Sequence, residues 1–214
     1  MRKVIAIDGP SGSGKSTICR LLAEKLGFQY LDTGALYRAV ALHLRKNNVT
    51  DGNNDPEIKD ALNGVSVSFR NGLVFLGDED VSDAIRTTEA GHYASVFSAR
   101  KAVRDFLMQT QRDSALQNDI VAEGRDMTTV VFPSAWRKFY LDASEESRAR
   151  RRYLQLQEKG MAITMEEALK DVRERDLRDS QRDIAPLKRA DDAIYIDTTL
   201  IGLDEVMATI ISFL

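Results

Sequence analysis

The residues with the clearest chemistry lie between Gly9 and Thr17, where glycines, hydroxyl residues and a lysine fit the pattern G-x-x-x-x-G-K-[ST]. Glycines let successive backbone N–H groups turn toward a phosphate, and a helix that begins near Lys15 points its positive end at the same anion. We expect Lys15 to reach the β- and γ-phosphates of a nucleoside triphosphate and Ser16 to ligate Mg²⁺. The predicted triphosphate-binding residues are Gly9, Pro10, Ser11, Gly12, Ser13, Gly14, Lys15, Ser16 and Thr17.

The motif requires a strand before the loop and a helix after it, and the sequence supplies both. Apolar residues predict a strand over residues 4–8, and helical spacing predicts a helix over about residues 15–26. Strand and helix patterns then alternate, which is typical of an α/β fold with a parallel sheet. We therefore predict a P-loop NTPase-type five-stranded parallel sheet with helices on both faces, its strands at residues 4–8, 30–32, 120–123, 139–142 and 194–197.

One segment departs from this alternation. Two short alternating runs flank Asn71-Gly72, a strong hairpin signal because both residues tolerate positive φ. We predict a small antiparallel β insertion over about residues 47–83, facing the acceptor substrate, with a third short strand beginning near Val81. A long helical stretch over about residues 89–117 then returns the chain to the main sheet. The alternative is that the insertion is only a surface loop without a role in substrate binding.

A second segment is rich in arginine. Residues 148–159 read as a basic helix, Gly160 interrupts it, and a capping box begins the next helix at Thr164. Such a pair of helices suits a helical lid over about residues 148–165 that closes over phosphates. Together with the insertion, this predicts a single domain over residues 1–214 whose core comprises residues 1–46 and 84–214.

Composition limits the classes of partner. The chain has 214 residues, of which 29% are charged and 43% hydrophobic, and a formal net charge of −3. This balance is typical of a soluble globular protein and argues against a nucleic-acid partner. No signal peptide or membrane-spanning run is evident, and Cys19 is the single cysteine, so we expect a cytoplasmic protein with no membrane partner and no disulfide. We expect a monomer, and Cys19 as a small buried residue.

The remaining charged residues bear on what happens to the γ-phosphate. The chain lacks the D-x-x-G and N/T-K-x-D motifs of GTPase switches, and His43 and His92 form no catalytic arrangement and are expected to be surface or packing residues. Arginines are instead spread over several segments. Arginine binds phosphate bidentately and stays charged, so the pattern favours transfer to an acceptor that is already an anion. A nucleoside monophosphate, with a second pKa of about 6, needs no deprotonating base.

Several blocks resemble the bacterial cytidylate kinase family in order and spacing, from Val4 to about Asp197. The resemblance implies a kinase that uses ATP and Mg²⁺ to phosphorylate CMP or dCMP. It also implies an enlarged monophosphate-binding insertion. The blocks are Asp32-Thr33-Gly34-Ala35-Leu36-Tyr37-Arg38, Glu123-Gly124-Arg125-Asp126-Met127, Val130-Val131-Phe132-Pro133, Leu154–Gly160, and Arg175-Asp176 through Arg178-Asp179 and Arg182 to Leu187.

The resemblance also implies residue roles. Lys15 and Arg125 would be catalytic, and Arg38 and Arg125 would clamp the monophosphate. The cytosine edge would be read by Thr33, Arg104, Asp126 and Arg182. The sugar would be contacted by Ser95, Arg175 and Asp179, with Tyr37 lining the same pocket. Bound ATP would be contacted by Arg148, Arg151 and Arg152.

Alternatives stay open at this point. The charges around Arg173 and Arg178 also fit a solvated helix face, Asp126 also fits a helix cap, and Tyr37 also fits a core position. The chain departs from the family pattern at Glu123, where Asp is expected, and at Thr128, where Gly is expected; we expect Thr128 to matter little. The rival functions are another small-molecule kinase, acting on UMP, TMP or an acid such as shikimate, and a nucleotide-binding switch without an acceptor.

Overall fold

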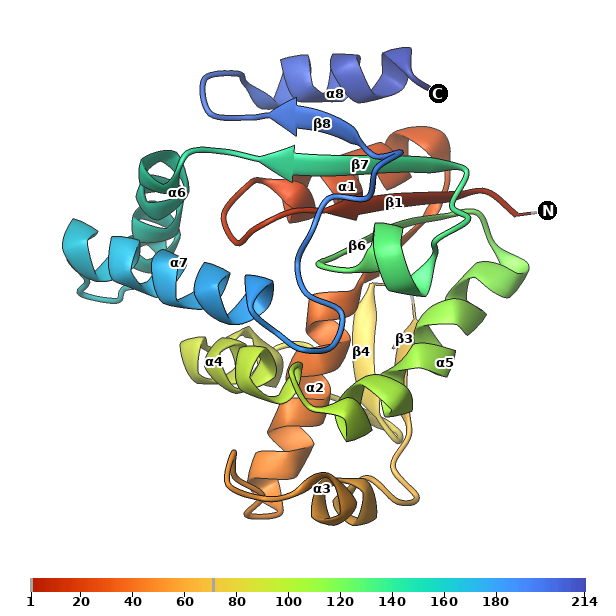
Figure 1. Cartoon of the computed structure of the whole chain (residues 1–214), viewed down its shortest axis with the longest axis vertical. Helices are drawn as coiled ribbons and strands as arrows, with labels where there is room; N and C mark the ends of the chain where they lie inside the picture. The colour runs from red at the N-terminus through yellow and green to blue at the C-terminus, as the bar shows by residue number, and fades with distance from the viewer. Residues whose placement is uncertain (1, 71) are drawn as a thin grey trace.

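A five-stranded parallel sheet forms the centre of the molecule. The structure, a computed structural model, describes residues 2–70 and 72–214. The strands are β1 (Val4–Asp8), β2 (Gln29–Asp32), β6 (Ile120–Gly124), β7 (Arg137–Asp142) and β8 (Ile194–Asp197). They lie in the order β2-β6-β1-β7-β8, so that β1 is central (Figure 1). This confirms the predicted sheet, in which β6 lies between β1 and β2 although it follows both in the sequence.

Helices cover both faces of this sheet, as predicted. Side chains alternate along β1, so that Ala6 belongs to one buried cluster while Ile5 and Ile7 belong to another. The helices α1 (Lys15–Leu26) and α8 (Leu203–Ser212) pack on the second cluster. Cys19 is buried in this cluster, as expected of a small apolar residue. The helices α2 (Thr33–Lys46) and α5 (Lys101–Gln117) pack on the first.

The predicted antiparallel insertion is present as a second sheet. Its strands are β3 (Val67–Arg70), β4 (Leu73–Leu76) and β5 (Glu79–Asp80), in that spatial order. Arg70 pairs with Leu73 across the hairpin, and Asn71 of the predicted turn lies outside the described residues. The third strand ends before Val81 rather than beginning there. Figure 1 places this sheet beside α2 and α5.

The insertion also contains a helix that was not predicted, α3 (Asp55–Ala61). Asn54 accepts a hydrogen bond from the Glu57 backbone N–H, and the Glu57 carboxylate accepts one from the Asn54 backbone N–H. Pro56 lies in the first turn of the helix, where its missing N–H is tolerated. The residues of this capping box can be recognised in the sequence, so α3 could have been predicted from them.

The helical stretch predicted over residues 89–117 is wrong as one helix. It consists of α4 (Thr88–Phe97), preceded by the short turn η1 (Ala84–Arg86), and of α5. Arg100 interrupts the stretch with an extended backbone, φ −85° and ψ 128°. Its guanidinium Nε donates to Asp55 Oδ1 at 2.8 Å. The break therefore follows a contact with the distant helix α3, and no glycine or proline marks it.

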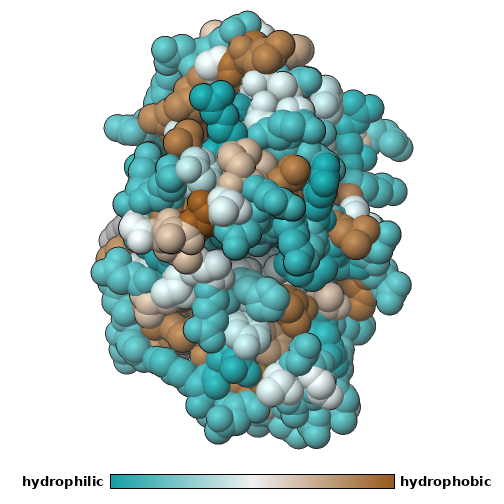
Figure 2. All heavy atoms as spheres, turned by 90° about the vertical axis from the view of Figure 1, so that its left-hand side faces the viewer, coloured by the Kyte–Doolittle hydropathy of each residue, from teal (hydrophilic) through white to brown (hydrophobic). Residues whose placement is uncertain are grey.

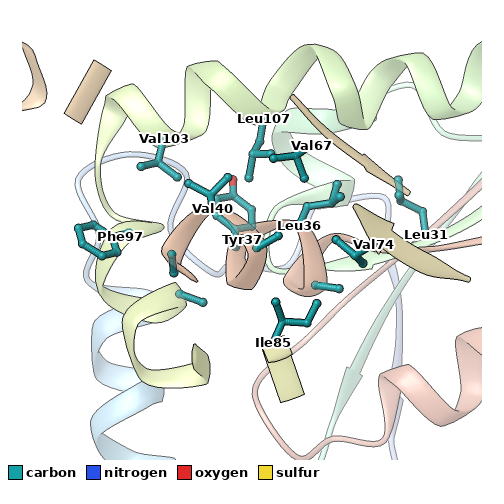
Figure 3. Close-up of a cluster of buried hydrophobic side chains, with 14 of the residues drawn as sticks. Leu31, Leu36, Tyr37, Val40, Val67, Val74, Ile85, Phe97, Val103 and Leu107 are labelled. Atoms are coloured by element: carbon teal, nitrogen blue, oxygen red, sulfur yellow. The ribbon is translucent and has the colours of Figure 1, made fainter. Parts of the chain in front are cut away.

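A large apolar cluster joins the insertion to the core (Figure 3). Leu36 and Tyr37 of α2, Phe97 of α4 and Leu107 of α5 belong to it, and Leu36, Phe97 and Leu107 are fully buried. Val74 of β4 lies in the same cluster. Burial of such side chains stabilises the fold by roughly 1.5–3 kcal/mol each. The second sheet is thereby fixed against the helix that follows β2.

Two helices with many charged residues project from the core, α6 (Glu145–Glu158) and α7 (Met165–Ser180), and they pack on each other. The helix α6 begins before the predicted Arg148, because the Ser144 hydroxyl accepts a hydrogen bond from Ser147 N–H and caps it. The predicted capping box of Thr164 and Glu167 is confirmed at the start of α7. Figure 1 shows both helices beyond the ends of β1 and β7.

Candidate active site

Parallel pairing brings three predicted site segments to one edge of the sheet. Asp8, at the end of β1, is the register partner of Gly124 at the end of β6. Asp32, at the end of β2, is the register partner of Glu123. The phosphate-loop motif follows β1, so it lies beside the segments that begin at Asp32 and Glu123. The carboxyl edge of a parallel sheet is where ligands of such folds bind.

The phosphate loop is packed closely against β7. Gly9 has φ +150°, and a Cβ atom there would lie 1.9 Å from the carbonyl oxygen of Leu141, so only glycine fits. Lys15 is 5% exposed. Its Nζ donates to the carbonyl oxygen of Pro10 at 2.6 Å and to Ser13 Oγ at 3.2 Å. Burial, and the nearby Arg125 guanidinium, lower the pKa of Lys15.

Glu123 and Ser16 form a pair of oxygen donors beside this loop. Ser16 Oγ donates to Glu123 Oε2 at 2.9 Å, and the Tyr30 hydroxyl donates to Glu123 Oε1. Thr33 Oγ1 donates to the Glu123 carbonyl oxygen at 2.6 Å. Sequence reasoning missed Tyr30, because nothing local on a short strand marks a contact 93 residues away. Hydroxyl and carboxylate oxygens are ligands that Mg²⁺ accepts, so this pair fits the predicted metal.

Asp8 anchors the turn that follows β6. It is fully buried and accepts hydrogen bonds from the backbone N–H groups of Met127 (2.9 Å) and Thr128 (2.7 Å). Thr128 Oγ1 also donates to Asp8 Oδ2 at 2.6 Å. Met127 begins the short π-helical turn η2 (Met127–Val131). The expectation that Thr128 matters little is therefore wrong, because its side chain helps to fix the segment that follows Arg125 and Asp126.

Several arginines lie near this turn, and some of their guanidinium nitrogens have no hydrogen-bond partner among the described residues. Arg125 Nε donates to Asp179 Oδ2 at 2.8 Å, and Arg182 donates through one terminal nitrogen to Ser98 Oγ at 3.1 Å. Within the described residues, Arg175 Nε and Arg182 Nε and Nη2 are buried and have no hydrogen-bond partner. Burial, and the nearby Arg125, lower the pKa of Arg175 to about 10. The arrangement is suited to an anionic ligand.

A second buried group lies where α5 meets the end of β6. Arg104 and Asp126 form an ion pair in which each side chain is 3% exposed. Arg104 also donates to the Ser98 carbonyl oxygen at 3.2 Å, and its guanidinium carbon lies 5.7 Å from the centre of the Tyr37 ring. Asp126 makes no side-chain cap for η2, so the helix-cap alternative is wrong. The predicted base-reading residues Arg104, Asp126 and Arg182 thus converge around Ser98.

Two other predicted residues are already paired. Arg38 donates to Asp32 Oδ2 at 3.0 Å, while Asp32 also caps α2 by accepting from the Ala35 backbone N–H. The Ser95 hydroxyl accepts a hydrogen bond from Arg178 Nε at 3.2 Å. The alternative of a solvated helix face does not fit Arg178, which faces α4. It fits Arg173, which is exposed and pairs with Glu145 at 2.8 Å.

An open pocket of about 340 Å³ lies between α4 and the pair α6–α7. Figure 2 shows the corresponding face as mainly hydrophilic, with a hollow near its middle. Its cationic lining residues are Arg152, Arg175 and Arg178, and His92 and Tyr93 lie on the α4 side. His92 also packs edge-on against Tyr93, and His43 is bonded to the Ala61 carbonyl group at 2.9 Å. The expectation that both histidines are surface or packing residues is met, since His92 is exposed at the border of the pocket.

The three predicted ATP-binding arginines of α6 make different contacts. Arg148 donates to the carbonyl oxygens of Ala143 (2.9 Å) and Ser11 (3.3 Å) and pairs with Asp176 at 2.5 Å. Arg151 donates to the Gly12 carbonyl oxygen at 3.2 Å. Arg152 instead pairs with Asp171 of α7 at 2.9 Å. Two of the three therefore touch the phosphate loop, and Arg152 borders the pocket.

Comparison with known proteins places these features in a family. The family model described as "Cytidylate kinase" matches residues 5–214. A cytidylate kinase of Thermodesulfovibrio yellowstonii is 54% identical over 99% of this chain and 97% of its own length. One of Thermosipho melanesiensis is 50% identical over 97% of this chain and 94% of its own length.

The fold also has a counterpart among solved structures. An uncharacterized protein from Eubacterium ventriosum matches with a TM-score of 0.57 at 14% identity, covering 99% of this chain and 98% of that chain. At this identity the match concerns the fold alone. Across residues 2–70 and 72–214, no helix combines the length and apolarity needed to cross a membrane.

Replacing Asp8 by Asn should alter how stability depends on pH. Burial raises the pKa of Asp8 to about 6, although hydrogen bonds from Thr128 oppose the rise. In the unfolded chain the group titrates near its ordinary value of about 3.9, so the native state binds the extra proton between these values. Ionisation of Asp8 therefore lowers the free energy of unfolding as pH rises from about 4 to about 6, and Asp8→Asn removes this contribution. The destabilisation caused by Asp8→Asn should shrink by about 1–3 kcal/mol between pH 4 and pH 7, measured by urea unfolding.

The exposed Asp183 provides a matched control as Asp183→Asn. A pH-dependent difference of the same size in that variant, or a constant difference for Asp8→Asn, would contradict the protonation of Asp8 in the native state.

Proposed function

Since the chain belongs to the cytidylate kinase family, we propose how the residues at the edge of its sheet act in the reaction of that family. The chain is an ATP-dependent kinase that transfers the γ-phosphoryl group of ATP to the 5′-phosphate of CMP or dCMP, giving CDP or dCDP. One observation carries the assignment of the acceptor site. Buried guanidinium nitrogens of Arg175 and Arg182 have no partner among the described residues; both side chains lie beside Asp179, and Arg175 also lies beside Arg125.

ATP binds along the loop from Gly9 to Thr17, with its phosphates against the backbone N–H groups and the start of α1. Lys15 leaves its contacts with Pro10 and Ser13 and pairs with the β- and γ-phosphates. Its charge is costly in the free protein because it is buried beside Arg125, and the phosphates offset that cost. Arg148 and Arg151, which already touch the loop carbonyls, contact the bound nucleotide together with Arg152.

Ser16 and Glu123 are the residues that would hold Mg²⁺. In residues 2–70 and 72–214 no group of three or more His, Cys, Asp or Glu side chains could hold a metal ion, which fits an ion that takes most of its ligands from phosphates and water. When bound, Mg²⁺ neutralises charge that develops on the β- and γ-phosphates. The Ser16 hydroxyl, 2.9 Å from Glu123 Oε2, and that carboxylate supply oxygen ligands directly or through water.

The monophosphate of the acceptor binds between Arg38 and Arg125, and the ribose between Ser95, Arg175 and Asp179. Arg125 Nε donates a hydrogen bond to Asp179, and this bond orients the remaining nitrogens of Arg125 toward an anion. These groups cancel the repulsion between two phosphates and align the attacking oxygen with the γ-phosphorus. No general base is needed, because the monophosphate oxygen is already ionised at neutral pH.

Cytosine is read by Thr33, Arg104, Asp126 and Arg182, with Tyr37 along the pocket wall. A guanidinium donates to the O2 and N3 atoms of cytosine, while an acceptor oxygen is needed for its amino group. The ion pair of Arg104 with Asp126 fixes the orientation of that guanidinium. Uracil presents an N–H group at position 3, where cytosine presents an acceptor, so the same guanidinium discriminates against it.

About residues 148–165, from α6 to the start of α7, act as a lid, and residues 47–83 act as the monophosphate-binding insertion. Closure of the lid excludes water and protects ATP from hydrolysis. The net charge of −3 gives no support to a nucleic-acid partner. We assign the enzyme to the cytoplasm as a monomer, because the substrates are two small nucleotides and the sites described lie within one chain.

An acceptor screen tests the assignment directly. Coupled ADP production would be measured with ATP, Mg²⁺ and, in turn, CMP, dCMP, UMP, dTMP, AMP, GMP and shikimate. We expect CMP and dCMP to be strongly preferred. A preference for UMP, dTMP or shikimate would keep the phosphate site but overturn the base-reading residues. Slow ATP hydrolysis that no acceptor stimulates would instead support a nucleotide-dependent switch.

Replacing Arg125 by Ala should lower kcat by about 10²–10³-fold, because the variant lacks a preorganised donor aimed at the transferring phosphoryl group. Arg125→Lys should recover little, since lysine lacks the planar fork that binds phosphate and Asp179 at once. Arg173→Ala is the matched control, because it also removes an arginine, from the helix α7 that carries Asp179, but Arg173 pairs with Glu145 at the surface. Near-normal turnover in a folded Arg125→Ala protein, judged by circular dichroism, would remove Arg125 from the site.

Replacing Asp126 by Asn should reduce discrimination between CMP and UMP by about 10–100-fold in kcat/KM, because the hydrogen bond to a charged partner that orients Arg104 is weakened. The side chain keeps its size, so the buried contact is retained. The ratio of kcat/KM for the two acceptors is the measurement, with Arg173→Ala again as control. An unchanged ratio together with lower activity on both acceptors would reject a base-reading role.

A further inference from the structure

The carboxylate of Glu123 is held by a different hydroxyl group at each oxygen. Oε2 accepts from Ser16 Oγ at 2.9 Å, whereas Oε1 accepts from the Tyr30 hydroxyl. Glu123 is 5% exposed, and its backbone carbonyl is fixed separately by Thr33. The direction in which Oε2 points therefore depends on the partner at Oε1.

Tyr30 reaches Glu123 because of the pairing between β2 and β6. Asp32 lies opposite Glu123 in the register, and Tyr30 lies two residues earlier on β2, so the side chains of Tyr30 and Glu123 share one face of the sheet. That face is the one covered by α1, at whose start Ser16 lies. The Tyr30 ring packs with the apolar cluster under α1 and meets Phe69 edge-on at 6.3 Å. Its hydroxyl therefore projects from a fixed ring.

Glutamate in this position has a conformational cost that aspartate lacks. The family pattern leads one to expect Asp where this chain has Glu123, and Glu adds a methylene group and one rotatable bond. Each additional torsion that must be fixed before a ligand binds reduces affinity unless the protein fixes it in advance. A hydrogen bond at the oxygen that faces away from Ser16 fixes the added torsion.

We propose that Tyr30 is a positioning residue that holds Glu123 with Oε2 toward Ser16 and the nucleotide-bound Mg²⁺. It thereby allows the longer glutamate side chain to act as a ligand of the metal in this kinase. The proposal rests on the proposed placement of Mg²⁺ at Ser16 and Glu123. Tyr30 does not touch the substrate or the metal. Burial, and the adjacent Glu123 carboxylate, raise the pKa of Tyr30, so that its hydroxyl stays protonated and donates at neutral pH.

The test compares Tyr30→Phe with the unsubstituted chain through binding, without turnover. Isothermal titration of a non-hydrolysable ATP analogue at a series of Mg²⁺ concentrations gives the apparent affinity for Mg²⁺ in the complex. We expect Tyr30→Phe to weaken that affinity by about tenfold, as substitutions of residues that orient metal ligands commonly do. Affinity for the analogue without Mg²⁺ should change less than about twofold, because Tyr30 lies away from the phosphate loop itself.

Two further variants separate positioning from packing. Tyr195→Phe is the matched control, since it removes a hydroxyl 3.5 Å from Asp142 at the sheet edge and should leave the Mg²⁺ dependence unchanged. Glu123→Asp tests the same contact by changing the carboxylate side chain instead of the hydroxyl group. Aspartate lacks the torsion that Tyr30 fixes, so the affinity for Mg²⁺ of the Glu123→Asp variant should not depend on the Tyr30 hydroxyl. Tyr30→Phe should therefore have little further effect in the Glu123→Asp background, and the two effects are not additive.

An unchanged affinity for Mg²⁺ in folded Tyr30→Phe, or strictly additive effects in the double variant, would overturn the proposal. If Tyr30→Phe fails to fold, Tyr30→Met, an adaptable apolar side chain without the hydroxyl, replaces it, and an unchanged affinity for Mg²⁺ in that variant would overturn the proposal. Failure of the proposed function is distinguishable, because it would appear in the unsubstituted chain as absence of phosphorylation of CMP or of Mg²⁺-dependent nucleotide binding.

Discussion

The arrangement of this molecule depends on positive charge that the protein buries without full compensation. Arg125, Arg175 and Arg182 lie around the carboxylate of Asp179, whose pKa they lower despite its burial. Nitrogens of Arg175 and Arg182 are left without partners in the described part of the chain. Burying such groups is unfavourable unless something pairs with them. The free protein thus carries a local cost that an anionic substrate removes, and the apolar cluster of α2, α4 and α5 stabilises the scaffold that bears it.

The sequence predicts whatever is local, and the phosphate loop is the clearest case. Its glycines, Lys15 and Ser16 act through their own backbone and the helix that follows, so one segment of sequence contains the whole motif. The sheet follows from a repeated alternation of strands and helices. The break around Arg100 does not, because it depends on Asp55 of another helix. The helix α3 is an intermediate case, since its capping residues Asn54 and Glu57 form a local motif that can be recognised in the sequence.

Contacts between distant segments could not be predicted. Asp8 and Thr128 are 120 residues apart, and Tyr30 and Glu123 are 93 residues apart. Each pair exists only because strand register brings the two residues to the same edge of the sheet. The resemblance to a family could suggest roles for Arg104 and Asp126, because those residues match its pattern. It could not do so for Tyr30 or Thr128, whose contacts with Glu123 and Asp8 depend on strand register.

The two halves of the site differ in how their cations are satisfied. On the ATP side, Lys15 bonds to Pro10 and Ser13, and Arg148 and Arg151 bond to the carbonyl oxygens of Ser11 and Gly12. Phosphates bound as proposed would displace these protein acceptors and exchange the contacts that hold α6 against the loop. On the acceptor side, Arg38 and Ser95 are likewise paired, with Asp32 and Arg178, but buried nitrogens of Arg175 and Arg182 have no partner among the described residues. In the proposed site, binding of ATP would therefore be coupled to the position of α6, whereas binding of the acceptor would mainly relieve charge repulsion that is already present.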